Sequence, residues 1–196
     1  MSNNVQQQSP LAHTQWLPYP ADAADAAAIA LRERPLLQMI TLRGDPADAG
    51  FMAAAQAALG VALPTQANTV RDGDAHGVAW MGPDEWLVQS RLPHGTAGLP
   101  ARLTAALEGY FASVVEVTSG YTVIDIDGPH AADVLAKGCA MDLHPRAFGA
   151  GACAQTRFFD AAVFLRRTAR GITLTTRRSF APYVAEMLVD AAREYA

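Results

Sequence analysis

The sequence predicts an α+β protein made of two similar ferredoxin-like, split-βαβ halves, with antiparallel or mixed sheets that pack tightly against each other. Residues 38–118 contain a strand, a helix, two strands, a helix and a strand, which is the ferredoxin-like split βαβ order. Residues 121–193 begin again with a strand and a helix, and continue with three strands and a helix. No linker rich in proline and serine separates the halves, so we expect one extended interface between them.

The first 35 residues differ in composition from the rest. Residues 1–20 are polar and lack the apolar core of a secretory signal, while the Ala-rich stretch 23–31 is too short to span a bilayer. We therefore expect an N-terminal arm over residues 1–35, flexible or docked on a partner, a first half over 36–118 and a second half over 119–196.

In the first half, residues 38–43 alternate as a strand and lead into a helix. Asp45 is a suitable N-cap, Pro46 fits the first helical position and Gly60 fits the C-cap. The apolar stripe between them consists of Phe51, Ala55, Ala58 and Leu59. Residues 62–74 are predicted to be a polar loop.

The stretch Trp80-Met-Gly-Pro-Asp-Glu-Trp-Leu-Val88 predicts a strand, a tight turn and a second strand, because Pro83 cannot donate to a sheet ladder. The two strands are expected near 75–81 and 85–90. A second helix begins near Pro100, and its apolar stripe is predicted to be Leu99, Leu103, Leu107, Tyr110 and Phe111. The last strand of this half is expected over residues 113–118.

The second half opens with a strand over residues 121–127. Gly128-Pro129 then starts a short helix that Gly138 ends. Three strands are expected near 152–158, 161–167 and 171–177, followed by a helix from about Ala181 to Arg193.

Composition and charge limit the classes of partner. The chain has 196 residues, of which 51% are hydrophobic, and a formal net charge of −4, which does not suit a nucleic-acid-binding protein. Residues 141–180 hold seven arginines and two aspartates, either as a solvated hairpin face or as a surface for an anionic partner. The aromatic residues are not interleaved with these arginines, as an RNA-binding surface would require. Two cysteines, Cys139 and Cys153, indicate a reducing, cytoplasmic location.

Acidic and histidine residues give two candidate sites. Asp142 and His144 could join His130 or Asp127 around a metal ion, although they also fit a plain turn. Asp125 and Asp127 share one face of a strand and could act as acid and base. Alternatively, Asp125 pairs with an arginine on a neighbouring strand and Asp127 caps the following helix.

Two further motifs are weaker. Lys137-Gly-Cys139 fits an activated thiolate, or a helix end followed by a buried cysteine. Gly149-Ala-Gly151 lacks the third glycine of a dinucleotide loop and follows no strand. No set of residues combines a nucleophile, a base and an orienting group. We therefore predict no catalytic, cofactor-binding or metal-binding residue on this chain.

The residues best suited to contact a partner are Trp86, Arg166, Arg167, Arg177 and Arg178. Adjacent residues on a strand point to opposite faces of the sheet, so one arginine of each pair can face the carboxylate of a partner. Trp86 either fills the core or anchors an interface.

Four motifs are notable for their order and spacing. They are Leu42-Arg-Gly-Asp-Pro46, Met81-Gly-Pro-Asp-Glu-Trp-Leu87, the run from Ser119 through Gly128-Pro-His130 and Cys139-Ala-Met-Asp-Leu-His-Pro145 to Arg157, and Arg178-Ser-Phe-Ala181. Together they resemble the gamma subunit of heterotetrameric sarcosine oxidase, over about residues 36–195.

The resemblance implies an aminomethyltransferase-like fold and a non-catalytic role. It implies that this chain forms a complex with alpha, beta and delta subunits. The complex would be an oxidoreductase that converts sarcosine to glycine with production of hydrogen peroxide, and it would pass the one-carbon unit to tetrahydrofolate. FAD, FMN, NAD, tetrahydrofolate and zinc are implied on the partner subunits, and no cofactor on this chain. Contact with neither nucleic acid nor a membrane is expected.

Two alternatives stay open. One is a stand-alone folate-binding or one-carbon-transfer protein, because Lys137-Gly-Cys139 is similar to the Lys-Gly-Cys of folate-dependent iron–sulfur maturation proteins. However, Ala140-Met-Asp142 replaces the aromatic, glycine and glutamine residues that follow there. The other alternative is a gamma-like subunit of a complex that acts on a different N-methylated amine.

Overall fold

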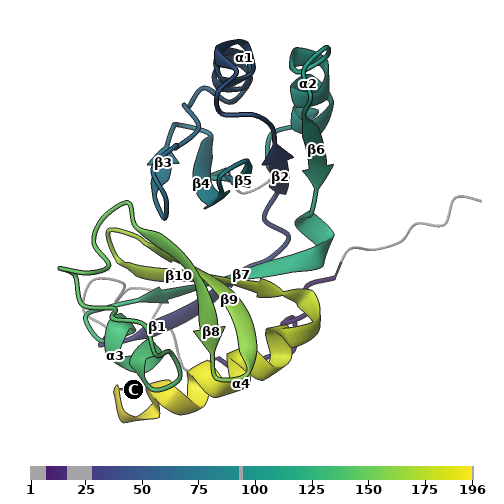
Figure 1. Ribbon diagram of the computed structural model, residues 1–196. Helices are drawn as coiled ribbons and strands as arrows, with labels where there is room; N and C mark the ends of the chain where they lie inside the picture. Colours follow the sequence, from purple (N-terminus) through teal and green to yellow (C-terminus); the bar gives the residue numbers. More distant parts are fainter. Residues whose placement is uncertain (1–7, 17–27, 93–94, 196) are drawn as a thin grey trace, which may run out of the picture.

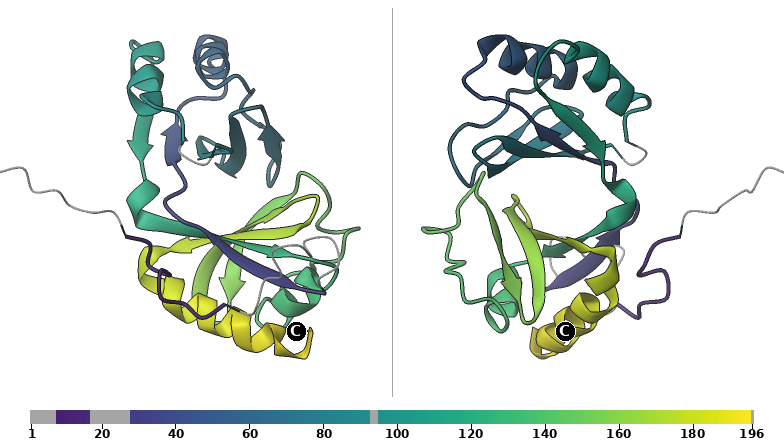
Figure 2. Two further views of the ribbon diagram at one scale, coloured as in Figure 1. Left: turned by 180° about the vertical axis from the view of Figure 1, so that it is seen from behind. Right: turned by 45° about the vertical axis from the view of Figure 1, so that its right-hand side comes forward.

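Two five-stranded antiparallel sheets lie face to face, and helices cover the outer face of each sheet (Figures 1 and 2). The computed structural model of the chain describes residues 8–16, 28–92 and 95–195. Each connection between the sheets is short, and the four layers follow one another as helices, sheet, sheet and helices (Figure 1). The predicted α+β class with two packed sheets is confirmed.

The upper sheet in Figure 1 has the strand order β3-β4-β5-β2-β6. Its elements are β2 (Met39–Arg43), α1 (Ala49–Leu59), β3 (Val70–Asp72), β4 (His76–Gly82), β5 (Glu85–Ser90), α2 (Leu99–Ala106) and β6 (Ser113–Glu116). The order β6-β2-β5-β4 is the ferredoxin-like order that the sequence predicts. β3 is an addition, in the region predicted to be a loop. Its three residues form a strand because they pair with β4, not because they alternate in polarity.

The start of α1 differs from the prediction. Asp48, not Asp45, is the N-cap, and its side chain accepts hydrogen bonds from the backbone N–H groups of Gly50 and Phe51. Asp45 instead accepts from the N–H of Ala47 in the preceding turn, at 2.8 Å. Gly60 ends the helix in the left-handed conformation, with φ of 72°, as predicted for a C-cap.

The end of α2 corrects the predicted apolar stripe. The helix ends at Ala106, and Gly109 adopts a φ of 88°, so the chain turns before it reaches Phe111. Leu99, Leu103 and Leu107 are buried as expected, but the side chain of Phe111 is 99% exposed. The helical spacing of apolar residues continues in the sequence as far as Phe111. The helix itself ends one turn earlier, because Gly109 reverses the chain.

The lower sheet has the strand order β1-β7-β10-β9-β8. Its elements are β1 (Ala30–Arg34), β7 (Tyr121–Asp127), α3 (Ala131–Ala136), β8 (Cys153–Phe158), β9 (Ala161–Arg167), β10 (Gly171–Arg177) and α4 (Ala181–Ala192). The strands and helices predicted after residue 120 are all present. The ferredoxin-like arrangement predicted for this half is wrong, because β8, β9 and β10 form a meander, and β10 rather than β9 lies next to β7.

β1 lies within the segment that the sequence analysis assigns to an arm. It pairs with β7 along its whole length, from Ala30 opposite Asp127 to Arg34 opposite Val123. Only Ala30 and Leu31 of this strand are well buried, so it shows little apolar alternation. Residues 1–7 and 17–27 of the predicted arm lie outside the described residues, and the boundaries of the two halves stay a prediction.

Three hydrophobic clusters hold the layers together. One lies between α1, α2 and the upper sheet, one lies between α3, α4 and the lower sheet, and the third lies between the two sheets. The third cluster consists of Leu37, Met39, Ala79, Leu87, Val123, Cys153 and Phe164. Beside it, the side-chain amide of Gln89 on β5 donates to the hydroxyl of Thr175 on β10 at 3.1 Å. The sheets are therefore joined by a continuous buried contact, as the sequence predicts.

Trp86 lies in the core beneath the upper helices. Its side chain has no exposed area, its ring lies 5.9 Å from that of Phe51, and its indole N–H donates to the carbonyl of Pro64 at 2.8 Å. Of the two roles left open for Trp86, the structure shows the core role. No part of the ring is accessible to a partner in this conformation.

Replacing Trp86 with alanine should lower the free energy of unfolding by about 3–5 kcal/mol, because the change leaves a large cavity and an unpaired Pro64 carbonyl. Urea denaturation of the purified chain measures the loss. Trp80→Ala is the matched control, since Trp80 is only half-buried and should lose clearly less. Equal losses for the two variants would contradict the assigned core role.

Candidate functional site: an arginine-lined cleft between the sheets

An open cleft of about 810 Å³ lies at one border of the contact between the two sheets. β1, β7, β9 and β10 of the lower sheet line it, together with Asp72 of β3 and the segment after β5. Its charged lining residues are Arg32, Arg34, Arg91, Arg166, Arg167 and Arg170, with Asp72, Asp125 and Asp127. The cleft therefore has a surplus of positive charge.

Asp125 is held by two arginines of β1. Its carboxylate lies 3.2 Å from Arg32 Nη2 and 3.3 Å from Arg34 Nε, and it accepts a hydrogen bond from the hydroxyl of Thr173 at 3.2 Å. The expected pairing of Asp125 with an arginine on a neighbouring strand is confirmed. These contacts already occupy both oxygens of the Asp125 carboxylate, so the geometry does not direct it at a substrate.

Asp127 is placed differently from its neighbour. The predicted helix cap is wrong, because α3 begins later, at Ala131, after His130. The Asp127 carboxylate instead lies in the cleft, 3.7 Å from Arg170 Nε. Burial raises the pKa of Asp127, and the nearby charge of Asp125 raises it further. This group therefore holds a proton more readily than an ordinary aspartate does.

Arg166 connects the two sheets across the cleft. Its Nη2 on β9 lies 2.5 Å from both carboxylate oxygens of Asp72 on β3. Gly77 of β4 leaves room for this pair, since a Cβ there would lie 2.6 Å from Arg166 Nη1 and 2.7 Å from Asp72 Oδ1. Among the described residues, the Nε atoms of Arg34 and Arg166 are buried without a hydrogen-bond partner. The ion pair with Asp72 therefore makes Arg166 a contact between the two sheets.

Arg167 fixes a loop on the other face of the same sheet. Its guanidinium donates to the carbonyl of Phe148 at 2.8 Å and to that of Leu143 at 2.6 Å, and lies 5.6 Å from the centre of the Phe148 ring. Burial lowers the pKa of Arg167. Both hydrogen bonds go to backbone carbonyls of one loop, so the side chain holds the segment from residue 143 to 148 in place.

Arg177 and Arg178 lie away from the cleft, where β10 leads into α4. Arg177 is exposed, and its guanidinium lies 5.9 Å from the centre of the Tyr121 ring. Arg178 is half-buried and donates to the backbone carbonyl of Gln8 at 2.6 Å. The five residues proposed as an interface are therefore not brought together. Trp86 is in the core, Arg166 and Arg167 serve internal contacts, and only Arg177 and Arg178 remain at an accessible surface.

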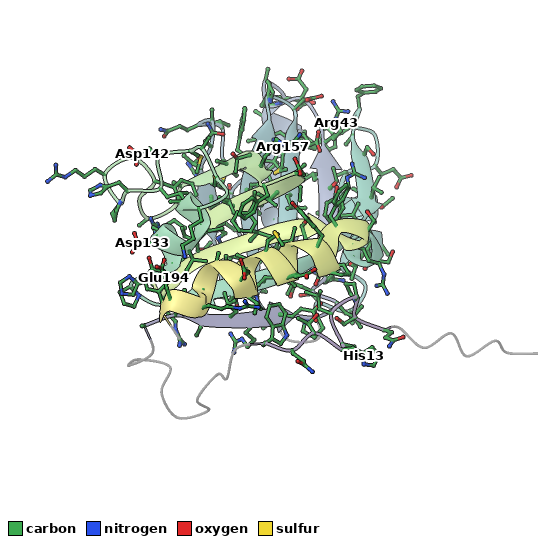
Figure 3. The ribbon with its side chains drawn as sticks, turned by 90° about the horizontal axis from the view of Figure 1, so that it is seen from below. His13, Arg43, Asp133, Asp142, Arg157 and Glu194 are labelled. Carbon is green, nitrogen blue, oxygen red and sulfur yellow. The ribbon has the colours of Figure 1, made fainter. Side chains whose placement is uncertain are left out.

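The remaining candidate motifs are structural in this fold. The amine of Lys137 donates to the carbonyl of Ala191 and pairs with Glu194 at 2.5 Å, so it faces the end of α4 and not Cys139. Figure 3 shows Glu194 beside Asp133 at that end of the helix. Burial raises the pKa of Cys153 to about 11, which keeps this thiol protonated and unreactive.

Asp142 and His144 form a turn. The carboxylate of Asp142 accepts from the backbone N–H of His144 at 2.9 Å, and Asp142 lies on an outer loop (Figure 3). Within the residues that the structure describes, no three His, Cys, Asp or Glu side chains are grouped to hold a metal ion. Gly149 and Gly151 belong to the same long loop, which forms part of the cleft wall.

Several residues of the cleft are not indicated by the sequence patterns. Arg32 and Arg34 lie in β1, which the pattern of residues 30–34 does not predict, and Asp72 lies in a stretch whose polar residues predict a loop. Arg91 follows β5, and its guanidinium donates to the carbonyl of Gly73 at 2.8 Å. The alternation of Arg32 and Arg34, which places both side chains on one face, was the only sequence signal that could have indicated this site.

Comparison of the fold with solved structures indicates the broad class of protein to which this chain belongs. The structure of glycine cleavage system aminomethyltransferase T from Bartonella henselae matches 87% of this chain and 48% of its own, with a TM-score of 0.64 and 18% sequence identity. This likeness shows a shared fold and confirms the aminomethyltransferase-like architecture.

The particular family follows from closer relatives. The model of the sarcosine oxidase, gamma subunit family matches residues 43–194. Sarcosine oxidase subunit gamma of an Arthrobacter species is 38% identical over 90% of this chain and 86% of the relative. A chain of heterotetrameric sarcosine oxidase from Corynebacterium sp. U-96 superposes with a TM-score of 0.83 and 33% identity, over 96% of this chain and 95% of that one. The chain belongs to the sarcosine oxidase gamma subunit family.

Gly77→Ala should destabilise the chain by about 1 kcal/mol, because the added methyl group makes room only by separating Arg166 from Asp72. Gly82→Ala on the same strand is the control, since its nearest neighbour would be Glu85 Cβ at 3.7 Å. Urea denaturation measures both. The loss at position 77 should shrink in an Arg166→Met background, and a loss of unchanged size there would contradict the proposed cause.

Asp127→Asn should change how stability depends on pH. Because the folded-state pKa of Asp127 is raised above its ordinary value of 3.8, folding disfavours the charged form. In the parent chain, ionisation of Asp127 costs no stability at pH values well below 3.8. The cost grows as the pH rises from 3.8 to the folded-state pKa, and it stays constant at higher pH. The variant lacks this cost, so its stability relative to the parent should rise over that interval.

Urea denaturation between about pH 4 and pH 7 tests this dependence. Asp160→Asn makes the same substitution at the exposed β8–β9 turn and is the matched control, measured over the same pH range. A difference for Asp127→Asn that does not vary with pH would contradict the raised pKa.

Proposed function

We propose that this chain is a non-catalytic subunit of a heterotetrameric oxidase that oxidises sarcosine to glycine and hydrogen peroxide. The observation that carries the proposal is its match, over almost its whole length, to a chain of heterotetrameric sarcosine oxidase. The match to the gamma subunit family supports it further. The proposal does not favour a stand-alone one-carbon-transfer enzyme, because the relatives that cover the chain are named as subunits.

The chemistry of the cleft supports a role in assembly. Asp125 is bound by Arg32 and Arg34, and Asp72 by Arg166, so these charges are already directed at each other. The Asp125 contacts join β1 to β7 within the lower sheet, and the Arg166–Asp72 pair joins the two sheets, whereas a catalytic group needs a side chain directed at a substrate. In this proposal the chain provides a rigid body of fixed shape to its partners.

The cofactors of the reaction belong to the partners in this proposal. FAD, FMN and NAD would lie on the other subunits, as would the sites for tetrahydrofolate and zinc. The partners are the alpha, beta and delta subunits, and the complex is cytoplasmic. No helix in the described part of the chain is long and apolar enough to cross a membrane.

Arg177 and Arg178 are the proposed contacts of this chain with a partner carboxylate. Both lie at the transition from β10 to α4, and Arg177 is exposed. A guanidinium on a rigid strand end loses little freedom when it binds a carboxylate in a two-pronged geometry. Of the residues suggested from the sequence, Arg177 is exposed, and Arg178 is half-buried with one of its N–H groups bound to the carbonyl of Gln8.

Co-expression with the other oxidase subunits should give a complex that co-purifies with this chain, binds flavin and oxidises sarcosine. The chain purified alone should show neither flavin absorbance nor sarcosine oxidation. Arg177→Glu with Arg178→Glu should lower the recovery of partners at least about fivefold while the lone chain keeps its unfolding midpoint.

The control makes the same charge change elsewhere, with Arg146→Glu and Arg157→Glu, both on exposed positions of the lower half. These substitutions should leave recovery unchanged. Stoichiometric flavin on the lone chain would contradict the proposed function. Full recovery with the Arg177 and Arg178 variant would contradict only the proposed contact.

A further inference from the structure

β6 is an edge strand that pairs with β2 alone among the described strands (Figure 1). The N–H of Val117 donates to the carbonyl of Met39 at 2.9 Å, which makes these residues a hydrogen-bonded pair of the ladder. Bonded and non-bonded pairs alternate along antiparallel strands, so the N–H and C=O groups of Val114 and Glu116 point away from β2. β6 therefore presents free backbone donors and acceptors along its outer side.

The side chains around this edge are unusually apolar for an exposed strand. Phe111, just before β6, is 99% exposed and Val115, within it, is 50% exposed. Phe111 also lines an open cleft of about 570 Å³, together with Pro46 and Ala112. Edge strands of soluble proteins are usually protected by charges, prolines, bulges or a covering segment. Among the described residues, Glu116 is the single charge on β6 and no segment covers the strand, so the edge has the features of a docking surface.

The charges beside the edge indicate what kind of chain would dock. Asp45 and Asp84 line the same cleft as Phe111, and Glu116 lies at the other end of β6. Arg43 pairs with Asp84 at 2.5 Å, which leaves Asp45 and Glu116 as a negative surplus. A second copy of this chain would bring the same carboxylates toward each other, and like charges disfavour such pairing. A different chain with basic side chains fits the edge better.

We propose that β6 accepts a β-strand of a partner subunit, which extends the upper sheet by one strand. Its backbone pairs with Val114 and Glu116, its apolar side chains cover Phe111 and Val115, and its basic side chains face the carboxylates of Asp45 and Glu116. This inference rests on the proposed function, because it requires that the chain be assembled with other subunits.

The edge is continuous with the surface around Arg177 and Arg178. The short helix η1 (Thr118–Gly120) leads from β6 to Tyr121, over which Arg177 lies. β6 and the start of α4 are both on the right-hand side of Figure 1. A partner that adds a strand to β6 is therefore close to Arg177 as well, with acidic groups along the strand and basic groups beyond its end.

Hydrogen exchange tests the backbone contact directly. The amides of residues 114 and 116 should exchange rapidly in the lone chain, and at least about tenfold more slowly in the purified complex. The amides of Thr41 and Leu87, within the sheet, should be protected in both samples. Equal exchange of the two edge amides in the lone chain and the complex would overturn the proposal.

Phe111→Ser combined with Val115→Lys tests the side-chain contact. These changes remove the apolar cover and place a positive charge opposite the basic partner, so recovery of partner subunits should fall at least about tenfold. Phe159→Asn is the matched control, since Phe159 is 40% exposed and has a φ of 48°, which asparagine accepts readily. This control should keep full recovery, and both variants should keep the unfolding midpoint of the parent.

The outcomes separate the two proposals. If the parent chain assembles and the Phe111 and Val115 variant assembles equally well, the edge is not the interface, while the proposed function stands. If the parent chain itself fails to co-purify with the subunits, the proposed function fails. A lone parent chain that forms a dimer, which the variant converts to a monomer, would overturn the choice of occupant in favour of a second copy.

Discussion

The contact between the inner faces of the two sheets is the constraint on which the rest of this molecule depends. Each sheet has one face under helices, so only the other face is available to join the halves. The joint is apolar around Met39 and Phe164, and it is ionic where Arg166 meets Asp72. The apolar part supplies most of the free energy, since burial of hydrocarbon is favourable without exact geometry. The ionic part permits only one register.

This joint explains why charged residues are abundant in the cleft without forming a reactive centre. The sheets diverge at one border, and the inward-facing residues there reach water. Arginines on β1 and β9 neutralise aspartates on β7 and β3, which avoids an unpaired charge in a partly buried space. The raised pKa of Asp127 follows mainly from its burial in this space, and the neighbouring carboxylate of Asp125 raises it further. Structural networks perturb titration as readily as catalytic sites do.

The outer surface suits a protein that works in an assembly. Membership of the sarcosine oxidase gamma subunit family is established by sequence, and the exposed features can be read in that light. An exposed edge strand with Phe111 beside it, and arginines at the start of α4, lie on one side of the molecule. A body of two packed sheets that gathers these features on one side is well suited to fix the position of neighbouring subunits.

Periodicity, turn residues and motif order were sufficient to predict most of the local elements, the two packed sheets and the family. The β4–β5 hairpin followed from Gly82-Pro83, and the end of α1 from Gly60, because backbone constraints at these residues act over a few positions. Only the tertiary structure decided that residues 30–34 form β1 and that Arg166 pairs with Asp72, 94 residues away. It likewise decided that Phe111 faces solvent. Such outcomes depend on which distant segments meet, and local periodicity contains no information about those neighbours.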